Sequence, residues 1–366
     1  MKRCIFHYPG PIQENPSSGS AVRPNRMLNA FKAIGYEVEE VTGFSKERAE
    51  KIKEVRKKIR NGVKYNFVYS ENTSMPTAMA DSDHVPRHPV MDEVFLRKCR
   101  KAGIPVGLFY RDAYWQFPLY KESVKWFVPM VTIPIYKNEL KGYRKCTDVL
   151  FVPSNEFAEA IGYKGRYQEL PPGGDPISIN EDTERTDDRI RIFYVGGVSG
   201  LYDITVPVQI ISEFPEYRLT VCCAEKDWEA NETLKGIVAK IDNISVIHKK
   251  KHELGPFYIQ ADIAMAFFER NAYRDLAMPV KLFEYIGYGK PVIATAGTAA
   301  GRYIKDNDIG WAIDFDSEQL RTLLRSLAKD RNIIRTKTDK TIAVAPGNTW
   351  EARAQMVVKT LTELKQ

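Results

Sequence analysis

The chain has 366 residues, of which 43% are hydrophobic and 28% charged, and its formal net charge is +7. This length is too great for one ordinary domain, so we expect two domains of roughly 150–200 residues each. The composition is that of a globular protein with a sizeable core. Its modestly basic balance permits anionic partners such as nucleotides or lipid phosphates but identifies none of them.

Targeting and redox signals point to a cytoplasmic protein that is soluble or peripherally bound. The apolar run in MKRCIFHYPG is too short for a signal peptide, and the longest hydrophobic run, residues 126–136, falls short of the ~20 residues that span a bilayer. The five cysteines are scattered and form no CxxC pair. This pattern favours reduced core residues over a disulfide framework or a zinc site.

The first half of the chain alternates strand-like and helix-like segments. Strands are predicted near residues 3–9, 36–43, 65–71, 104–112, 148–154 and 167–175, and helices near 21–34, 45–61, 90–103 and 120–145. Strands separated by helices of this length imply βαβ units and a parallel sheet. Residues 1–172 are therefore expected to form a first Rossmann-like domain.

A polar, acidic stretch at residues 173–189 is predicted to be a linker. The alternation then restarts, with strands near 190–197, 217–224, 244–250, 261–268 and 290–295 and helices near 203–214, 228–240 and 317–329. Residues 190–345 form the second predicted domain, and a last helix lies within 346–366. The fold class is therefore α/β, with two doubly wound domains whose ligands bind at the carboxyl ends of the strands.

Glycines follow the first strand of the second domain, in FYVGGVSGLYD. Gly196, Gly197 and Gly200 allow backbone N–H groups and a helix N-terminus to approach a phosphate. The spacing is not the GxGxxG of a dinucleotide fold. A tight strand–helix turn explains these residues equally well.

The segment MPVKLFEYIGYGKPVIAT (278–295) predicts a short helix, a stop at Gly289 and a buried strand. Lys281 and Glu284 fall on one face of that helix. A lysine near the sheet edge can neutralise a diphosphate, and a carboxylate one turn deeper can accept hydrogen bonds from a vicinal diol. Taken alone, such a pair is more often a solvent-exposed ion pair.

The same segment, continued through AGTAAGRYI and NDIGWAI, resembles the donor-site signature of the GT-B nucleotide-sugar glycosyltransferases related to bacterial capsule and lipopolysaccharide enzymes. FYVGG, VPSNEFAEAIG, HKKKHELGPFYIQADIAMAFF and NTWEARA resemble further parts of that family, so the likeness covers most of the chain. The resemblance implies two Rossmann-like domains facing across a cleft, with the donor bound mainly by the C-terminal domain and the acceptor by the N-terminal one. The last helix is expected to pack back on the first domain.

The resemblance also implies residue roles. Glu284 is expected to bind the ribose and Lys281 the diphosphate, with Gly196 and Gly197 under the phosphates and the backbone near His248 facing the base. A second Glu that retaining members often carry is replaced by Leu276, and the Gly turn offers only Ser199 and Tyr202 where the family has Arg and Lys. Arg270 and Arg274 are the expected replacements for that charge.

The first domain contributes two predicted contacts. The loop NPSSGSAVRPNRM (15–27) resembles the first loop of the family, which reaches the diphosphate or the acceptor, so Gly19, Ser20 and Arg23 are candidate binding residues. A mobile surface loop is the alternative. Arg111 and Asp112 follow a predicted buried strand. A charged pair there lies where ligands of this fold class bind. The resemblance adds that related enzymes often place a His or Asp near this point to contact or deprotonate the acceptor hydroxyl, so Asp112 is the expected general base and Arg111 an expected substrate-binding residue. The alternative is that Asp112 is an internal partner of Arg111.

Helix 45–64 is rich in Lys and Arg. A solvated face is the usual interpretation, and contact with an anionic membrane is the alternative. Residues 124–136 are a further apolar and aromatic candidate for that contact, although a packed helix is the simpler interpretation. His84 and His88 are separated by prolines, so no metal ligand is expected there.

These observations together predict a glycosyltransferase that uses a UDP- or GDP-sugar and a saccharide or lipid-linked acceptor, in cell-surface polysaccharide synthesis near the inner face of the membrane. No metal, other cofactor or nucleic-acid partner is expected. The alternatives are a GT-B nucleotide-sugar epimerase and a catalytically silent GT-B partner protein.

Overall fold

The computed structural model describes residues 2–13, 19–175 and 187–364, which form two compact units. The N-terminal unit comprises residues 1–172 together with the final segment 350–366, and the C-terminal unit comprises residues 173–349. Most of the predicted linker and part of the predicted loop 15–27 lie outside the described residues.

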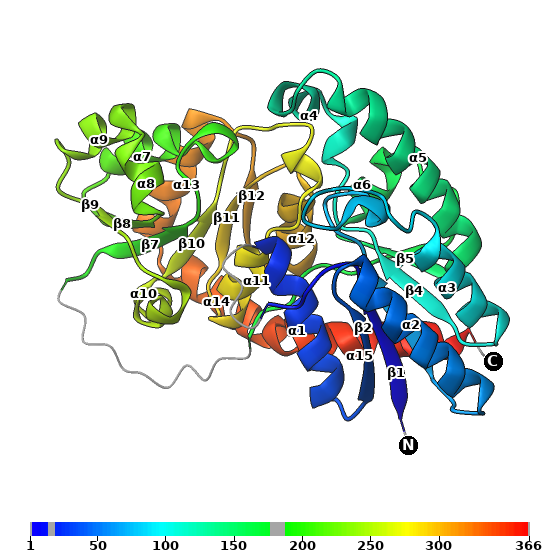
Figure 1. The fold of residues 1–366 in the computed structure, drawn as a ribbon. Coiled ribbons are helices and arrows are strands. Elements are labelled where there is room, and N and C mark those ends of the chain that lie inside the picture. Colours follow the sequence, from blue (N-terminus) through cyan, green and yellow to red (C-terminus); the bar gives the residue numbers. More distant parts are fainter. Residues whose placement is uncertain (1, 14–18, 176–186, 365–366) are drawn as a thin grey trace. The chain divides into compact units, whose positions relative to one another are not determined.

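The N-terminal unit is built on one parallel sheet (Figure 1). Its strands, in spatial order, are β2 (Glu37–Thr42), β1 (Arg3–Tyr8), β3 (Phe67–Glu71), β4 (Val106–Phe109), β5 (Val149–Val152) and β6 (Tyr167–Glu169). Its α-helices are α1 (Gly19–Ala33), α2 (Ser45–Arg60), α3 (Met91–Lys101), α4 (Pro118–Ser123), α5 (Val128–Cys146), α6 (Asn155–Ala160) and α15 (Trp350–Glu363).

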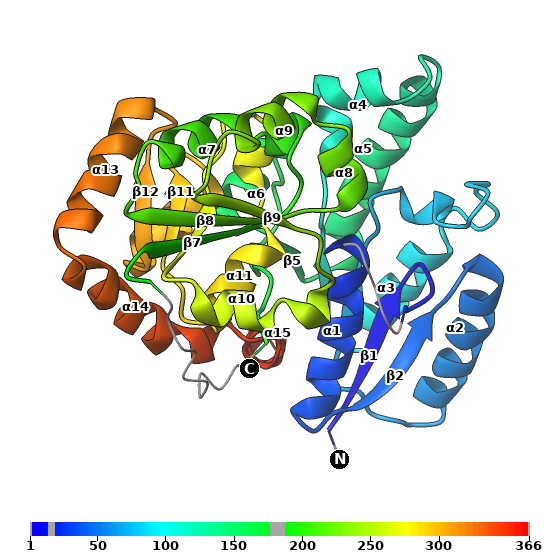
Figure 2. The same cartoon turned by 90° about the vertical axis from the view of Figure 1, so that its left-hand side faces the viewer.

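Side-chain alternation along β1 assigns the helices to the two faces of this sheet. Phe6 packs against Phe31 of α1, whereas its neighbour His7 bonds Asp92 of α3 on the opposite face. Helix α15 runs beside α1 (Figure 2). Its Leu361 lies against Gly107 of β4, where an added Cβ would come within 3.1 Å of the leucine. The end of the chain therefore completes the core of the N-terminal unit.

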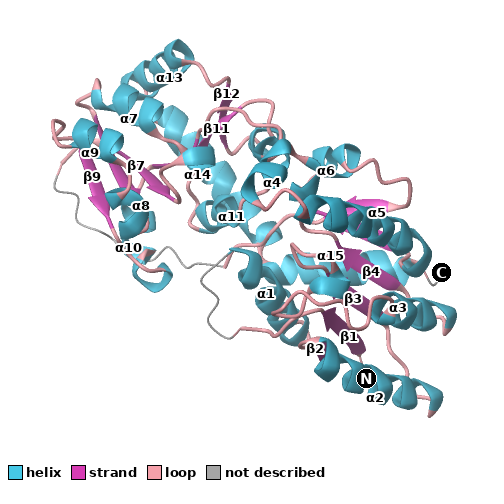
Figure 3. Ribbon diagram, turned by 45° about the horizontal axis from the view of Figure 1, so that its top comes forward, coloured by secondary structure: helices cyan, strands magenta, loops and turns pink. Residues whose placement is uncertain are grey.

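The C-terminal unit repeats the plan, with helices flanking a second parallel sheet (Figure 3). Its strands, in spatial order, are β12 (Gly310–Ile313), β11 (Val292–Thr295), β10 (Ile263–Ala266), β7 (Ile190–Val195), β8 (Tyr217–Cys222) and β9 (Ile244–Ile247). Its α-helices are α7 (Thr205–Ser212), α8 (Glu225–Glu229), α9 (Glu232–Val238), α10 (Gly255–Gln260), α11 (Val280–Gly287), α12 (Ala299–Asn307), α13 (Ser317–Lys329) and α14 (Asn332–Val344).

Strand order reverses once in each sheet. In the N-terminal unit the chain moves outward from β1 to β2 and then crosses to β3, and in the C-terminal unit it moves from β7 through β9 and then crosses to β10. A crevice opens beside the carboxyl ends of the strands at such a reversal, and ligands of doubly wound folds bind there. The prediction of two doubly wound α/β domains is confirmed.

Two predicted helices are divided in the structure. The helical region expected at residues 120–145 is split into α4 and α5, because Val124 has an extended backbone (φ −129°, ψ 163°). The helix expected at 228–240 is split into α8 and α9 at Asn231, whose side chain accepts a hydrogen bond from the Leu234 N–H. Helices α12 and α14 and strand β12 were not assigned from the sequence.

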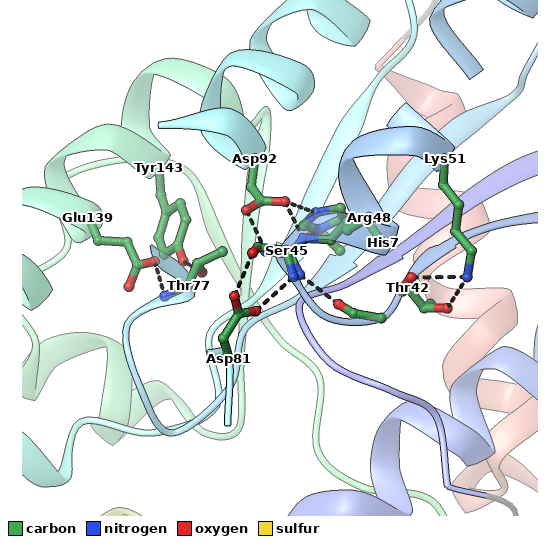
Figure 4. A network of polar contacts seen from close by, with 12 residues as sticks. His7, Thr42, Ser45, Arg48, Lys51, Thr77, Asp81, Asp92, Glu139 and Tyr143 are labelled. Carbon is green, nitrogen blue, oxygen red and sulfur yellow. Dashed lines mark hydrogen bonds and ion pairs between the residues drawn. The ribbon is translucent and has the colours of Figure 1, made fainter. Parts of the chain in front are cut away.

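A buried polar network ties α2 and α3 to β1 and β3 (Figure 4). Asp92 accepts two hydrogen bonds from Arg48, at 2.6 and 2.9 Å, and one from His7 Nε2 at 2.8 Å. The other ring nitrogen of His7 bonds Ser70 Oγ at 2.8 Å. Burial alone would raise the pKa of Asp92, but His7 and Arg48 hold it well below its usual range. Asp92 is therefore an ionised anchor inside the N-terminal unit.

Replacing Asp92 should destabilise this unit. Asp92→Ala leaves the Arg48 guanidinium buried without its partner, a change that costs about 3–5 kcal/mol in comparable cases. The midpoint of thermal unfolding should therefore fall clearly at neutral pH, as measured by calorimetry. Because the pKa of Asp92 is depressed, the difference from the parent should shrink as the pH falls below the ordinary Asp value of about 3.9. The exposed Asp83→Ala serves as a control with little expected effect, and an equal loss in both variants would contradict the account.

Candidate functional site

The candidate site lies at the carboxyl edge of the C-terminal sheet. The loop after β7 carries Gly196 and Gly197, and the loop after β10 leads to α11, which carries Lys281 and Glu284. Because β7 and β10 are neighbours at the point where strand order reverses, these two loops flank the crevice where ligands of this fold class bind.

Glu284 lies on the inner side of α11 and is 8% exposed. Pro279 precedes the first turn, where its missing N–H costs no hydrogen bond. Leu282, Phe283 and Ile286 are buried in the core of the unit and fix the rotation of the helix. The sequence therefore places a carboxylate inside the protein, one turn from the beginning of α11.

Three groups surround the Glu284 carboxylate. Its Oε2 accepts hydrogen bonds from the Tyr258 hydroxyl and from Lys281 Nζ, both at 2.8 Å. Lys251 Nζ lies 3.6 Å from Oε1. Lys281 and Glu284 therefore form an ion pair, as the helical spacing suggested. The pair is not the solvent-exposed one of the alternative interpretation, because its carboxylate is buried and also bonded by a tyrosine.

The charge state of this cluster follows from the same contacts. Burial raises the pKa of Glu284, but Lys281, Lys251 and the Tyr258 hydroxyl outweigh it and hold the pKa below its ordinary value. Burial, followed by the Glu284 carboxylate, raises the pKa of Tyr258. At neutral pH the glutamate is thus an ionised acceptor and the tyrosine remains a protonated donor.

The glycine turn after β7 is closely packed. The Tyr194 hydroxyl donates to the Gly197 carbonyl, and a Cβ on Gly196 would lie 2.6 Å from that hydroxyl. The Tyr285 hydroxyl accepts a hydrogen bond from the Val195 N–H at 3.1 Å, which joins α11 to the end of β7. Exposed Ser199 precedes the 3₁₀ turn at Gly200–Tyr202.

The two predicted arginines differ in their surroundings. Arg270 Nε donates to Asp275 at 2.9 Å, and the guanidinium also lies over Gly297. Arg274 stacks on the Phe268 ring at 4.8 Å, and burial lowers the pKa of its guanidinium. Asp275 is next to Leu276, the residue at the position where the family often has a second Glu. Its carboxylate binds Arg270 and therefore anchors its own loop. Roles for Arg270 and Arg274 remain predictions.

His248 directly follows β9, and its Nδ1 donates to the Cys223 carbonyl at 3.0 Å. A role for its backbone in base binding remains a prediction. The sequence interpretation missed Lys251 and Tyr258, although both lie in the stretch compared with the family's base-binding region. No local pattern predicts that they contact Glu284, because the contact depends on how α10 packs against α11.

In the N-terminal unit, Arg23 is an interior residue of α1 and not part of an open loop. It is 4% exposed, its guanidinium stacks on Phe109 at 3.4 Å, and its Nε lies 3.4 Å from the Glu71 carboxylate. Gly19 and Ser20 begin the same helix. The sequence placed Arg23 in the opening turns of this helix, and the packing of α1 turns its side chain toward the core. Binding roles for Gly19, Ser20 and Arg23 remain predictions.

Arg111 and Asp112 follow β4 at the carboxyl edge of the N-terminal sheet. Arg111 donates to Glu71 at 3.4 Å through its side chain and to the Asn72 side chain at 2.8 Å through its backbone N–H. The Asp112 carboxylate accepts from the Tyr114 N–H at 2.8 Å and so stabilises the following 3₁₀ turn. The role of Asp112 as a base remains a prediction.

Helix α2 is less strongly cationic than its composition suggests. Arg48 is turned inward to Asp92, and three of its lysines pair with glutamates: Lys51 with Glu47, Lys53 with Glu50, and Lys58 with Glu39. This pairing supports the interpretation as a solvated face. All five cysteines are buried and free.

The described ranges, 2–13, 19–175 and 187–364, lack two further kinds of feature. They contain no group of three or more His, Cys, Asp or Glu side chains placed to hold a metal ion. They also contain no helix that is long and apolar enough to cross a membrane.

The chain is similar to known proteins in its fold. No protein-family model and no curated protein sequence matches it. Its structure is similar to sucrose-phosphate synthase from Thermosynechococcus elongatus (TM-score 0.61, 13% identity, covering 99% of this chain and 98% of the other). It is also similar to WaaG, a glycosyltransferase of lipopolysaccharide biosynthesis (0.56, 15%, 99% and 100%), and to Anabaena HepE in complex with UDP (0.61, 11%, 99% and 100%). The chain has the GT-B fold of these proteins, as the sequence predicted.

Removing the ammonium group of Lys281 should raise the pKa of Glu284. Burial then acts with less opposition, because one of the charges that stabilise the carboxylate is lost. The titration of the Glu284 carboxyl carbon, followed by NMR in Lys281→Ala, should move to higher pH than in the parent. Lys240→Ala, an exposed lysine at the far end of the same unit, provides the control. An unchanged titration in Lys281→Ala would contradict the electrostatic description.

Proposed function

We propose that the chain is a glycosyltransferase that takes a sugar from a UDP- or GDP-linked donor. The observation that carries the proposal is the buried, ionised Glu284 carboxylate beside Lys281 at the strand-order reversal of the C-terminal sheet. One carboxylate that accepts two hydrogen bonds and one nearby cation match the diol and the diphosphate of a nucleotide sugar. Similar structures support this chemistry, since HepE has been solved in complex with UDP-glucose and a trehalose-6-phosphate enzyme of E. coli with UDP-2-fluoro glucose.

Donor binding rearranges the ion pair. In the described structure Lys281 Nζ bonds the same Glu284 oxygen as Tyr258 does. Ribose hydroxyls that donate to Glu284 replace the lysine there and leave its ammonium free for the diphosphate. Lys281 is 34% exposed in its side chain, so its end can move without unpacking α11.

The chemical step is then mainly electrostatic. Lys281, Arg274 and Arg270 stabilise the negative charge that develops on the departing nucleoside diphosphate, and backbone N–H groups near Gly196 and Gly197 contribute further donors. Asp112 removes the proton from the acceptor hydroxyl. The acceptor is a saccharide or a lipid-linked saccharide in cell-surface polysaccharide synthesis, an assignment supported by the likeness to WaaG.

Truncating the ribose ligand tests the donor site. Glu284→Ala removes two charge-assisted hydrogen bonds, each worth about 1.5–3 kcal/mol, so Kd for UDP or GDP should rise by at least about tenfold for the nucleotide that binds. Calorimetric titration measures this change, and Glu284→Gln should give an intermediate loss because it keeps one acceptor oxygen. Glu318→Ala, which truncates an exposed glutamate of α13, is the matched control. Unchanged affinity in Glu284→Ala would remove the ribose assignment.

Asp112→Asn separates catalysis from folding. Asparagine retains a side-chain oxygen for the Tyr114 N–H and so preserves the turn, but it cannot accept the acceptor's proton. We expect normal nucleotide binding and loss of sugar transfer, measured by product analysis with donor and acceptor present. Near-normal turnover would exclude Asp112 as the base.

The same product analysis distinguishes the alternatives. Conversion of the donor sugar without any acceptor would indicate an epimerase. Tight nucleotide binding with no turnover of any donor would indicate a catalytically silent GT-B protein, a possibility that the pairing of Arg270 with Asp275 favours.

A further inference from the structure

A pocket of about 540 Å³ lies along α5 in the N-terminal unit. Five cationic side chains line it: Lys121, Lys137, Lys141, Arg144 and Lys164. None of the described residues that line the pocket is acidic. Trp115 and Ile133 contribute apolar wall beside these charges. The pocket therefore combines a concave shape with one sign of charge, an arrangement that concentrates anions.

Among the described residues, these five side chains have no acidic partner. Within residues 2–13, 19–175 and 187–364, none of the five makes a side-chain hydrogen bond or an ion pair. This differs from α2, where Lys51 and Lys58 are neutralised by glutamates. Like charges that share a pocket repel one another, and a bound anion removes that repulsion. The pocket is thus a better anion site than the basic helix that the sequence drew attention to.

An exposed apolar cluster continues the same face of α5. Met130, Pro134, Lys137, Lys141 and Arg144 follow one another at spacings of three and four residues and so share one side of the helix. The first part of this stripe is apolar and the second part is cationic.

The apolar end of the stripe is open to solvent. Trp126 is 79% exposed and Met130 is 68% exposed, and Phe127 and Val131 extend the cluster. Exposed groups of this kind mark interaction surfaces, and Trp is enriched where proteins meet the membrane interface. With a rise of ~1.5 Å per residue, Met130 and Lys137 lie ~10 Å apart along the helix axis. Side chains of interfacial helices reach ~5–10 Å below the headgroups, so Met130 can be inserted while Lys137 stays at the level of the lipid phosphates.

The pocket extends from the segment after β4, which supplies Trp115 and Lys121, toward the amino ends of the strands. Arg144 lies near the end of α5, just before β5 begins, and Lys164 lies between α6 and β6. Both therefore lie toward the amino ends of the strands, whereas substrates of doubly wound folds bind at the carboxyl ends. A second ligand therefore explains Arg144 and Lys164 better than the sugar acceptor does.

We propose that this face of α5 docks on an anionic bilayer, with Trp126, Phe127, Met130 and Val131 in the interface and a lipid phosphate held in the pocket by its five cations. The proposal extends the proposed function by placing the enzyme where a lipid-linked acceptor is found. Docking itself requires neither donor nor acceptor, so its failure and the failure of the transferase assignment can be told apart.

Vesicle co-sedimentation of the full chain without nucleotide tests the proposal. We expect binding to phosphatidylcholine vesicles that contain phosphatidylglycerol, weak binding to pure phosphatidylcholine, and a loss of binding as salt is raised. Lys137→Glu combined with Lys141→Glu should lower binding at least about tenfold. Trp126→Ser combined with Met130→Ser should also lower vesicle binding, and the residual binding of this variant should be more sensitive to salt than that of the parent.

Lys57→Glu combined with Arg60→Glu, on exposed α2, is the matched charge control and should bind normally. Thermal unfolding of every variant checks the fold. Absence of binding to the phosphatidylglycerol vesicles, or loss in the α2 variant with none in the α5 variants, would overturn the proposal. A thermal-shift measurement with inorganic pyrophosphate tests for a soluble ligand. If pyrophosphate stabilises the parent but not the Lys137→Glu/Lys141→Glu variant, and the parent does not bind vesicles, the pocket binds free phosphate. That result would also overturn membrane docking.

Discussion

The candidate site depends on keeping one buried carboxylate ionised. Removing the charge of Glu284 from water costs several kcal/mol, and Lys281, Lys251 and the Tyr258 hydroxyl offset that cost. These partners also fix geometry. Tyr258 stacks on Tyr288 at 4.3 Å and so joins α10 to α11, and the Tyr285 hydroxyl joins α11 to the end of β7. The helix that carries the carboxylate is therefore positioned by its tyrosines at the reversal of strand order.

Each unit has a buried glutamate beside its reversal of strand order, but the groups that neutralise the two glutamates differ. In the N-terminal unit, Glu71 ends β3 beside the corresponding reversal and is fully buried, with Arg23 and Arg111 close to its carboxylate and the Tyr69 hydroxyl donating at 2.8 Å. Its cations and donor are part of the core. Glu284 keeps some exposure, and its lysines have mobile, partly exposed ends. A ligand can displace partners of that second kind, and this difference supports the proposal that the C-terminal unit binds the donor.

Local signals allowed much of the fold and part of the site to be predicted. Pro279, the helical spacing of Lys281 and Glu284, and Gly289 define α11 within a few residues, and strand–helix alternation gives the two sheets. The remaining features depend on distant contacts. Tyr258 reaches Glu284 across 26 residues, and Arg48 turns to Asp92 across 44. Composition alone therefore overstated the charge of α2, and it gave no sign that the cations of α5 gather around a pocket.

A crystal structure of the protein with bound nucleoside diphosphate would test the central claim most directly. UDP and GDP should each be tried, since the base is not fixed by the residues around Glu284. The account predicts that the ribose hydroxyls lie within hydrogen-bond distance of the Glu284 carboxylate, and that Lys281 has left the carboxylate for the diphosphate. A nucleotide bound elsewhere, or bound here with Lys281 still on Glu284 and no ribose contact, would contradict it.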